Sequence, residues 1–291
     1  MSRQRDAFYR YEFLVGNKKI ALPLFVPVIS VTPNTWFWNY GINHPAALIA
    51  YDSFISNKDF LKRAQKAGIK KALSYEDGII IIDNGAYGKV IEQNTKKIFN
   101  IQCAVKGDIA IILDVIPRSN MPNQWACVKK TVKNAKEIVN LKHNISILLE
   151  GIIHGITKSQ YLWCAEQLRH LNLDVYGIGV SSFLKHKKYE QGIEKILSIK
   201  DKLPKKAVIH ALGCGSRGYQ AILSALGISL FDSLSYFYYS IYHKKLDPIT
   251  VCSVGKCLKK QRCEKCLSVI KNENSKSLFQ YNLHEILKEN W

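Results

Sequence analysis

Short apolar runs alternate with amphipathic stretches along most of the chain. The apolar runs are rich in β-branched residues and are bounded by turn residues, which is typical of strands, whereas the amphipathic stretches have helical length and periodicity. The predicted strands are residues 22–30, 47–51, 78–83, 108–114, 145–154, 174–180, 207–212 and 228–233. The predicted helices are residues 58–66, 94–105, 124–139, 158–171, 189–202 and 218–226.

The predicted strands show little polar alternation, and most of them precede a predicted helix. This pattern indicates an α/β fold with a parallel sheet covered on both faces. Eight strands favour a (β/α)8 barrel, or TIM barrel, while a doubly wound open sheet stays open as the alternative. Polar residues at the carboxyl ends of strands favour the barrel further, because barrel enzymes hold their active sites there. These residues include Asp83, Asp114, His154, Gly213 and Asp232.

The carboxyl-terminal part of the chain has a different composition, rich in lysine and cysteine. We therefore expect a barrel over residues 1–245 and a small zinc-binding subdomain over residues 246–291. In that subdomain Cys263 and Cys266 form a CxxC pair, Cys257 precedes the pair, and His284 follows on a short helical pattern. Three thiolates and one imidazole would form a closed, structural Zn²⁺ site. Two alternatives stay open: an all-cysteine site that uses Cys252 instead of His284, and a redox-active CxxC pair.

The length and composition of the chain exclude several protein classes. A chain of 291 residues with 47% hydrophobic residues can bury a large core, which excludes a disordered protein and a small disulfide-stapled fold. The longest apolar stretch, residues 21–31, is interrupted by Pro23 and Pro27 and is too short for a membrane-spanning helix. The first residues carry no secretory signal. We therefore expect a cytoplasmic protein without a membrane partner.

The charge balance narrows the kind of partner. The chain has 42 lysine and arginine residues against 23 acidic residues, which gives a formal net charge of +19. Such an excess favours a surface that binds phosphate groups, and nucleic acid is therefore the leading partner class. The alternative is a lysine-rich composition without a binding role, because the lysine pairs are spread along the chain.

Two carboxylates are the leading candidates for chemistry. Asp83 and Asp232 each end an apolar strand, and the two strands lie far apart in the sequence. Two carboxylates at the ends of different barrel strands can converge on one substrate, one as nucleophile and the other as general acid and base. The alternative for each residue alone is a cap of a turn or helix.

A glycine-rich turn after a late strand presents a competing interpretation. Gly213, Gly215 and Gly218 loosely match the dinucleotide-binding fingerprint, with Asp232 further along the chain. That fingerprint normally begins a βαβαβ unit, whereas only one predicted strand follows here. The position disfavours nicotinamide or flavin binding, and the same glycines would suit close approach of the backbone to a flat ligand.

Taken in order, six short elements and the cysteine cluster resemble the tRNA-guanine transglycosylase superfamily over nearly the whole chain. The elements are Asp83-Asn84-Gly85-Ala86-Tyr87, Ile112-Leu113-Asp114-Val115, Gly151-Ile152-Ile153-His154-Gly155, Tyr176-Gly177-Ile178-Gly179-Val180, Leu212-Gly213-Cys214-Gly215 and Phe231-Asp232-Ser233. The carboxyl-terminal cysteines with Asn282-Leu283-His284 are similar to the zinc module of the same superfamily. The fold that the resemblance implies is again the barrel.

The resemblance implies a role for each site residue. Asp232 would be the nucleophile and Asp83 the general acid and base. Asp114 and His154 would bind the guanine edge, with His154 in place of the glutamine of the family, and Tyr87 would stack on the base. On the residues alone, the alternatives are a buried core or turn histidine for His154 and a packing residue for Tyr87. The base pocket would be completed by Gly179, Leu212 and Gly213.

Several departures from the tRNA-acting members guide the choice of substrate. Ser233-Leu234-Ser235 stands where those members have Pro-Thr-Arg, Gln261 stands where their first zinc cysteine is expected, and the chain is shorter. These departures resemble the DNA-acting branch, which inserts 7-deazaguanine derivatives into bacterial or phage DNA. We therefore expect a glycosyltransferase (pentosyltransferase) that exchanges guanine in DNA for a free 7-deazaguanine base such as preQ0, through a covalent glycosyl-aspartate intermediate.

This expectation has two alternatives. One is a tRNA-guanine transglycosylase that acts on tRNA. The other, from a different class, is a non-catalytic, zinc-containing nucleic-acid-binding protein. In the DNA-acting interpretation, the protein works in a bacterial or phage-infected cytoplasm, and other DNA-modification proteins are candidate partners.

Overall fold

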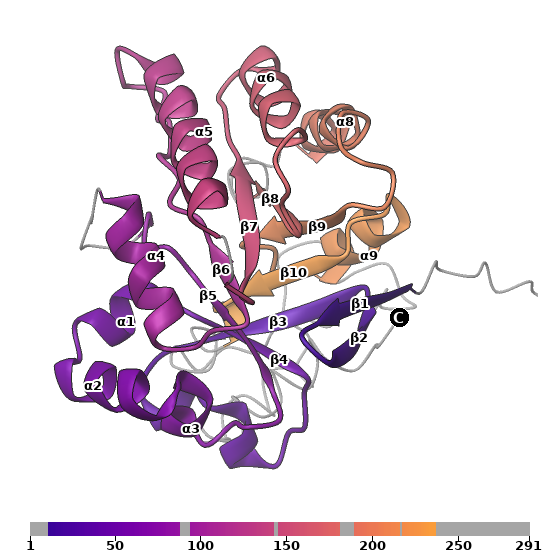
Figure 1. The fold of residues 1–291 in the computed structure, drawn as a ribbon. Coiled ribbons are helices and arrows are strands. Elements are labelled where there is room, and N and C mark those ends of the chain that lie inside the picture. Colours follow the sequence, from indigo (N-terminus) through magenta and orange to yellow (C-terminus); the bar gives the residue numbers. More distant parts are fainter. Residues whose placement is uncertain (1–10, 88–93, 143–144, 181–188, 216, 237–291) are drawn as a thin grey trace, which may run out of the picture.

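The computed structural model describes residues 11–87, 94–142, 145–180, 189–215 and 217–236. Within these residues eight parallel strands close into a barrel in the order β10-β3-β4-β5-β6-β7-β8-β9, with helices on the outside (Figure 1). The barrel strands are β3 (Leu24–Ile29), β4 (Ala46–Ile49), β5 (Ile79–Ile82), β6 (Ile109–Ile111), β7 (Leu148–Ile153), β8 (Val175–Gly179), β9 (Val208–Leu212) and β10 (Leu230–Ser233). The predicted (β/α)8 barrel is confirmed, and the open-sheet alternative is wrong.

All six predicted helices are present. They are α2 (Lys58–Ala67), α4 (Thr95–Ala104), α5 (Gln124–Leu141), α6 (Lys158–Leu168), α8 (Tyr189–Lys200) and α9 (Arg217–Ala225). Four of them begin at a residue whose side chain accepts a hydrogen bond from the first turn, which satisfies a free backbone N–H. Four short helical elements were not predicted: α1 (Tyr51–Ile55), α3 (Ile69–Leu73), and the 3-10 turns η1 (Pro33–Thr35) and η2 (Phe37–Tyr40).

The amino-terminal region corrects one predicted strand. Residues 22–30 do not form one strand, because β2 (Lys18–Leu22) ends at Leu22 and β3 begins after Pro23, which has no backbone N–H to donate. Strand β2 pairs antiparallel with β1 (Tyr11–Val15) as a separate hairpin beside β3 (Figure 1). Val15 and Ile20 of this hairpin pack in the same apolar cluster as the inward-facing strand residues. The hairpin therefore covers the amino-terminal end of the barrel.

The core has two parts that follow from the twofold periodicity of the strands. In β5, Ile79 and Ile81 belong to the cluster inside the barrel, while Ile80 and Ile82 belong to the cluster between the barrel and the helices. The next inward position after Ile81 is Asp83, at the carboxyl end of the strand. The same alternation directs polar residues from several other strands to this end of the barrel.

Charged pairs tie helical segments to the opposite end of the strands. Lys70 of α3 lies 2.7 Å from Asp108, whose other oxygen accepts a hydrogen bond from a β5 backbone N–H. Lys142, directly after α5, lies 2.7 Å from Asp174, which in turn accepts a hydrogen bond from the Leu149 N–H. In both arrangements, a carboxylate joins a lysine side chain to the backbone of a strand.

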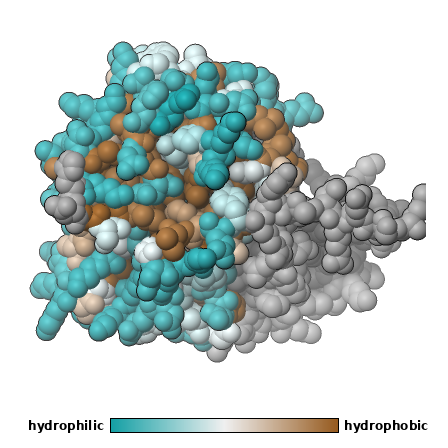
Figure 2. Space-filling model, turned by 45° about the vertical axis from the view of Figure 1, so that its right-hand side comes forward, coloured by the Kyte–Doolittle hydropathy of each residue, from teal (hydrophilic) through white to brown (hydrophobic). Residues whose placement is uncertain are grey.

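The surface fits the amphipathic pattern of the helices. Figure 2 shows hydrophilic residues over most of the face that it presents, with apolar surface between them. Among the described residues, no helix is both long enough and apolar enough to span a bilayer.

Candidate active site

A cavity of about 250 Å³ lies at the carboxyl ends of the barrel strands. It is smaller than the roughly 300–1,000 Å³ of typical pockets for drug-sized ligands, so it suits a single flat ring system. All eight residues that the sequence predicted for catalysis and base binding line it: Asp83, Tyr87, Asp114, His154, Gly179, Leu212, Gly213 and Asp232. The lining also includes Val28, Leu48, Asn84, Ala86, Ile111, Ile116 and Ile152, which were not singled out.

Asp83 directly follows β5 and is partly buried in the cavity wall. Burial of its carboxyl group raises its pKa to about 7, and the negative charges of Asp114 and Asp232 add to the effect. Hydrogen bonds from the backbone N–H groups of Asn84 and Gly85 act in the opposite direction, and the Asn84 bond is 2.8 Å long. A carboxyl group with a pKa near neutrality can both donate and accept a proton, as a general acid and base requires.

Asp232 lies near the end of β10 with 8% of its surface exposed. Its Oδ1 accepts a hydrogen bond of 2.8 Å from the Gly213 N–H, and Nε2 of His210 lies 3.1 Å from the same oxygen. Gly213 has a φ of 74°, a left-handed conformation that glycine adopts without strain and that orients this N–H. Among the described residues, both contacts of the carboxylate go to Oδ1. Oδ2 is therefore the oxygen available for attack on a substrate.

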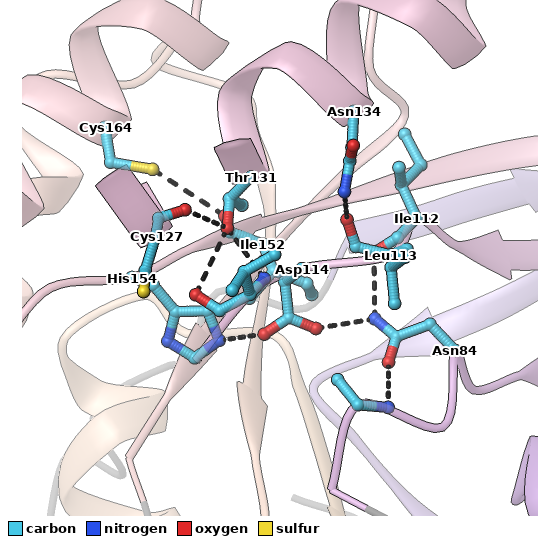
Figure 3. A network of polar contacts seen from close by, with 12 residues as sticks. Asn84, Ile112, Leu113, Asp114, Cys127, Thr131, Asn134, Ile152, His154 and Cys164 are labelled. Atoms are coloured by element: carbon cyan, nitrogen blue, oxygen red, sulfur yellow. Dashed lines mark hydrogen bonds and ion pairs between the residues drawn. The ribbon is translucent and has the colours of Figure 1, made fainter. Parts of the chain in front are cut away.

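Asp114, Asn84 and His154 form a polar network in the wall of the cavity, and Figure 3 shows Asp114 between the other two. Asn84 Nδ2 donates a hydrogen bond of 2.7 Å to Asp114 Oδ1, and His154 Nε2 contacts Asp114 Oδ2. Asn84 is fixed in turn, because it donates to the Ile112 carbonyl and accepts from the Ala86 N–H, each at 2.8 Å. Each carboxylate oxygen can accept a second hydrogen bond, so Asp114 can still bind a polar ligand edge.

Three further predicted residues shape the cavity. Tyr87 lies at its rim and is 73% exposed, which leaves much of its ring accessible to a flat ligand. Gly179 packs against His154, since a Cβ added there would lie 3.2 Å from the imidazole Cε1. Leu212 contributes apolar surface beside Gly213. The cavity thus combines apolar walls with one polar edge.

The glycine turn after β9 does not resemble a dinucleotide site. A Cβ added at Gly215 would lie 2.3 Å from Ser235 Oγ and 2.5 Å from Ser233 Oγ. At Gly215, therefore, serine side chains of the protein itself approach the backbone closely, where a dinucleotide site would have the ligand. The turn contributes its Gly213 N–H to Asp232, a role that fits a catalytic loop.

Sequence reasoning missed two buried ionisable residues next to the cavity. Glu150 of β7 and His210 of β9 are both fully buried, and His210 Nδ1 lies 2.9 Å from Glu150 Oε1. The available signal was a charged or titratable residue in the middle of a strand that is otherwise apolar. Such residues are rarely buried unless they are paired.

A second hollow, of about 830 Å³, lies between α4 and α5. It is lined by Asn94, Thr95, Lys96, Lys130, Lys133, Lys136, Glu137 and Asn140. Lys96 pairs with Glu137 at 3.2 Å, whereas Lys130 and Lys133 are exposed and make no ion pair with another described residue. Thr131, next to Lys130, accepts a hydrogen bond from the backbone N–H after Asp114. This basic groove therefore begins near the strand end that carries Asp114, at Lys130, and extends along α5 toward Asn140.

The predicted zinc ligands lie outside the described residues, as do the proposed domain boundary at residue 245 and the whole subdomain. These ligands are Cys252, Cys257, Cys263, Cys266 and His284. Within the part of the chain that the structure describes, no group of three or more histidine, cysteine or acidic residues could hold a metal ion. The zinc site stays a prediction from the sequence.

Comparison with known proteins agrees with the site. The family model described as queuine tRNA-ribosyltransferase matches residues 55–273. The tRNA-guanine(15) transglycosylase of Methanocaldococcus jannaschii is 30% identical over 82% of this chain, and that of Pyrococcus furiosus is 29% identical over 99% of it. These matches cover 38% and 52% of the two relatives, so the chain spans about half or less of their length.

The matched region contains every described residue of the cavity except Val28 and Leu48. Both carboxylates and the glycine turn between them therefore lie inside the family match. The chain belongs to the queuine tRNA-ribosyltransferase family, the group of transglycosylases that its motifs resemble.

Proposed function

We propose that this protein exchanges guanine in tRNA for a free 7-deazaguanine base, such as preQ0, through a covalent glycosyl-aspartate intermediate. The observation that carries the proposal is the presence of Asp83 and Asp232 in one base-sized cavity, with Asp114 and His154 on its polar edge. The names of the relatives favour tRNA as the substrate. They do not support the preference for DNA that the departures in sequence favoured.

In the first step the target nucleotide leaves its stack and its base enters the cavity, at an unstacking cost of a few kcal/mol. Asp114 and His154 hydrogen-bond to the guanine edge, and Tyr87 stacks on the ring. These contacts place C1′ of the ribose beside Asp232 Oδ2, while Gly213 holds Oδ1.

The second step forms the intermediate. Asp232 Oδ2 attacks C1′, and the C1′–N9 bond breaks with its electron pair on the base. The departing guanine takes the proton of Asp83, whose raised pKa of about 7 keeps that proton available near neutral pH. The ribose is then held as an ester of Asp232.

The third step reverses the roles. The incoming base occupies the cavity and gives its N9 proton to Asp83, and its N9 attacks C1′. The ester bond breaks, and its electron pair returns to Asp232. Two inversions at C1′ restore the β-linkage, as in a retaining glycosidase in which a base replaces water.

The basic groove between α4 and α5 supplies a path for the RNA backbone in this proposal. Lys130 and Lys133 are exposed, and they are the groove residues of α5 nearest to the start of that helix, next to Thr131. Lysines there can neutralise phosphates next to the flipped nucleotide, which supplies salt-dependent affinity. The zinc site, proposed from the sequence alone, would stabilise the carboxyl-terminal part of the fold, without a role in the chemistry. The cytoplasmic location also stays a prediction.

The test is incubation of the purified chain with labelled preQ0 or labelled guanine, together with either unmodified tRNA or duplex DNA. We expect label to enter tRNA and Asp232→Ala to block it. Incorporation into DNA alone would overturn the tRNA assignment and restore the sequence-based preference. Nucleic-acid binding with no incorporation, and with no covalent adduct when the incoming base is withheld, would refute the enzyme and favour a binding protein.

A further inference from the structure

Glu150 and His210 form an ion pair inside the barrel, next to the cavity. Both residues are fully buried, and His210 Nδ1 lies 2.9 Å and 3.1 Å from the two carboxylate oxygens of Glu150. The opposite ring nitrogen, Nε2, lies 3.1 Å from Asp232 Oδ1. The imidazole therefore lies between a buried glutamate and the proposed nucleophile.

Three neighbouring barrel strands bring this pair together. Glu150 is on β7 and His210 is on β9, and β8 lies between these strands. Gly177 of β8 is the register partner of His210, and a Cβ added to it would lie 2.5 Å from Glu150 Oε1. Only a glycine at this position leaves room for Glu150 to reach across β8.

The contacts of the His210 ring favour its positively charged form. Both ring nitrogens of His210 face carboxylate oxygens, and only an imidazolium carries a proton on each nitrogen. Burial alone would lower the pKa of His210, but the charge of Glu150, together with the contact to Asp232, raises it to about 10. The Nε2 contact to Asp232 is an ion pair rather than an aligned hydrogen bond, because this buried nitrogen has no hydrogen-bond partner among the described residues.

We propose that Glu150 and His210 act as a positioning pair for Asp232, which holds Oδ1 away from the substrate and stabilises the carboxylate when it leaves C1′. The inference rests on the proposed function and assigns it two further residues. Burying a charged pair is costly, and apolar residues of similar size are often as stable or more so. The position of the His210 charge beside Asp232 offers a functional reason for burying the pair.

The chemistry predicts which step depends most on the pair. During attack, Asp232 loses negative charge as Oδ2 bonds to C1′. During the second half of the reaction, the C1′–O bond breaks and the electron pair returns to the carboxylate, so negative charge develops beside the imidazolium. A fixed positive charge near a developing anion accelerates formation of that anion. Loss of the pair should therefore slow release of the ribose more than its capture.

The first test is Glu150→Gln, which keeps a hydrogen-bond acceptor for Nδ1 but removes the charge that holds His210 protonated. We expect kcat for base exchange to fall about 10- to 100-fold, with KM for tRNA and for the incoming base within about threefold of wild type. The covalent adduct should accumulate during turnover, detected as labelled RNA bound to denatured protein.

A double variant separates positioning from stability. Glu150→Leu with His210→Phe replaces the ion pair by apolar side chains, and its Tm should equal or exceed that of the wild type. We expect it to fold, to remain slow and to accumulate adduct. His44→Gln is the matched control, because His44 is also a buried histidine but lies outside the cavity lining, so its kcat should stay unchanged.

A wild-type kcat in the folded double variant would overturn the positioning role and make the pair structural. A fall in kcat that only parallels lower Tm, without adduct accumulation, would overturn it as well. Failure of the proposed function has a different outcome, because the wild-type protein itself would then form no adduct and exchange no base.

Discussion

The Gly213 N–H donates a hydrogen bond of 2.8 Å to Oδ1 of Asp232, which lies 19 positions further along the sequence. The turn after β9 thus fixes one oxygen of a carboxylate near the end of β10 and leaves the other without a contact to a described residue. Glycine permits this because the backbone has a φ of 74° at that position. The orientation of the proposed nucleophile is therefore set by two adjacent barrel strands.

Replacing Asp232 by alanine should abolish base exchange, because the proposed ester forms on its carboxylate. We expect a loss of at least about 10³-fold in kcat/KM, while affinity for tRNA changes little. Exchange of labelled base and a filter-binding assay measure the two quantities. An Asp232→Ala protein within tenfold of wild-type activity would remove Asp232 from the nucleophile role.

The two half-reactions should depend on pH in opposite directions, because Asp83 has a pKa of about 7. Adduct formation needs protonated Asp83, so its single-turnover rate should fall as the pH rises above about 7. Reaction of the adduct with the incoming base needs ionised Asp83, so that rate should fall below about the same pH. Asp83→Asn, which cannot change its charge, should lose both activities. Parallel pH profiles for the two steps would contradict this assignment.

Base recognition should depend on Asp114 more than on the identity of residue 154. Asp114→Ala removes an acceptor and leaves Asn84 and His154 without their shared partner, so kcat/KM should fall about 10²-fold or more. His154→Gln keeps a polar side chain of similar reach and should stay within about tenfold of wild type. Steady-state kinetics with varied tRNA and varied free base measure both effects. A larger loss for His154→Gln than for Asp114→Ala would reverse the ranking.

Charge reversal in the basic groove should weaken tRNA binding without changing the chemistry. With Lys130→Glu and Lys133→Glu combined, KM for tRNA should rise, and the dependence of log Kd on log salt should become shallower by about 1–2. The matched control reverses Lys62 and Lys66, which are exposed on α2 outside the groove. Equal effects of the two double variants would show that only net charge matters.

Removal of zinc should destabilise the protein, if the carboxyl-terminal cysteines bind it as the sequence predicts. We expect one zinc per chain by metal analysis and a lower Tm after chelation, with Cys263→Ser reproducing the loss. Cys252→Ser and His284→Ala then separate the two ligand sets, because only the residue that binds zinc should lower the zinc content. Full zinc binding by Cys263→Ser would refute the site.

Local periodicity accounts for most of what could be predicted from the sequence. The apolar runs locate all eight barrel strands, and a period of two places Asp83 and Asp232 on the inside of the barrel. The boundary between β2 and β3 was missed because apolar residues lie on both sides of Pro23, so the end of one strand and the start of the next look like one run. Helices as short as α1 and α3 carry too few residues to show a periodicity.

Contacts between distant segments could not be predicted in the same way. Glu150 and His210 are 60 residues apart and meet only because the barrel brings β7 and β9 to either side of β8. Each residue alone is an ionisable residue in an otherwise apolar strand. Only the closed barrel shows that the two form an ion pair. The choice between tRNA and DNA depended on differences from the motifs of the tRNA-acting members. Such differences show that the Pro-Thr-Arg element is missing, but they do not identify the substrate.

The hairpin of β1 and β2 has a consequence for the order of events in catalysis. Among the described residues, it covers the amino-terminal end of the barrel, while the cavity lies at the opposite end and suits one ring system. In the proposed reaction, the released guanine should therefore leave by the route that the next base uses to enter. Guanine and the incoming base then compete for the same ribosylated enzyme, so the kinetics should be ping-pong, with free guanine driving the exchange backwards.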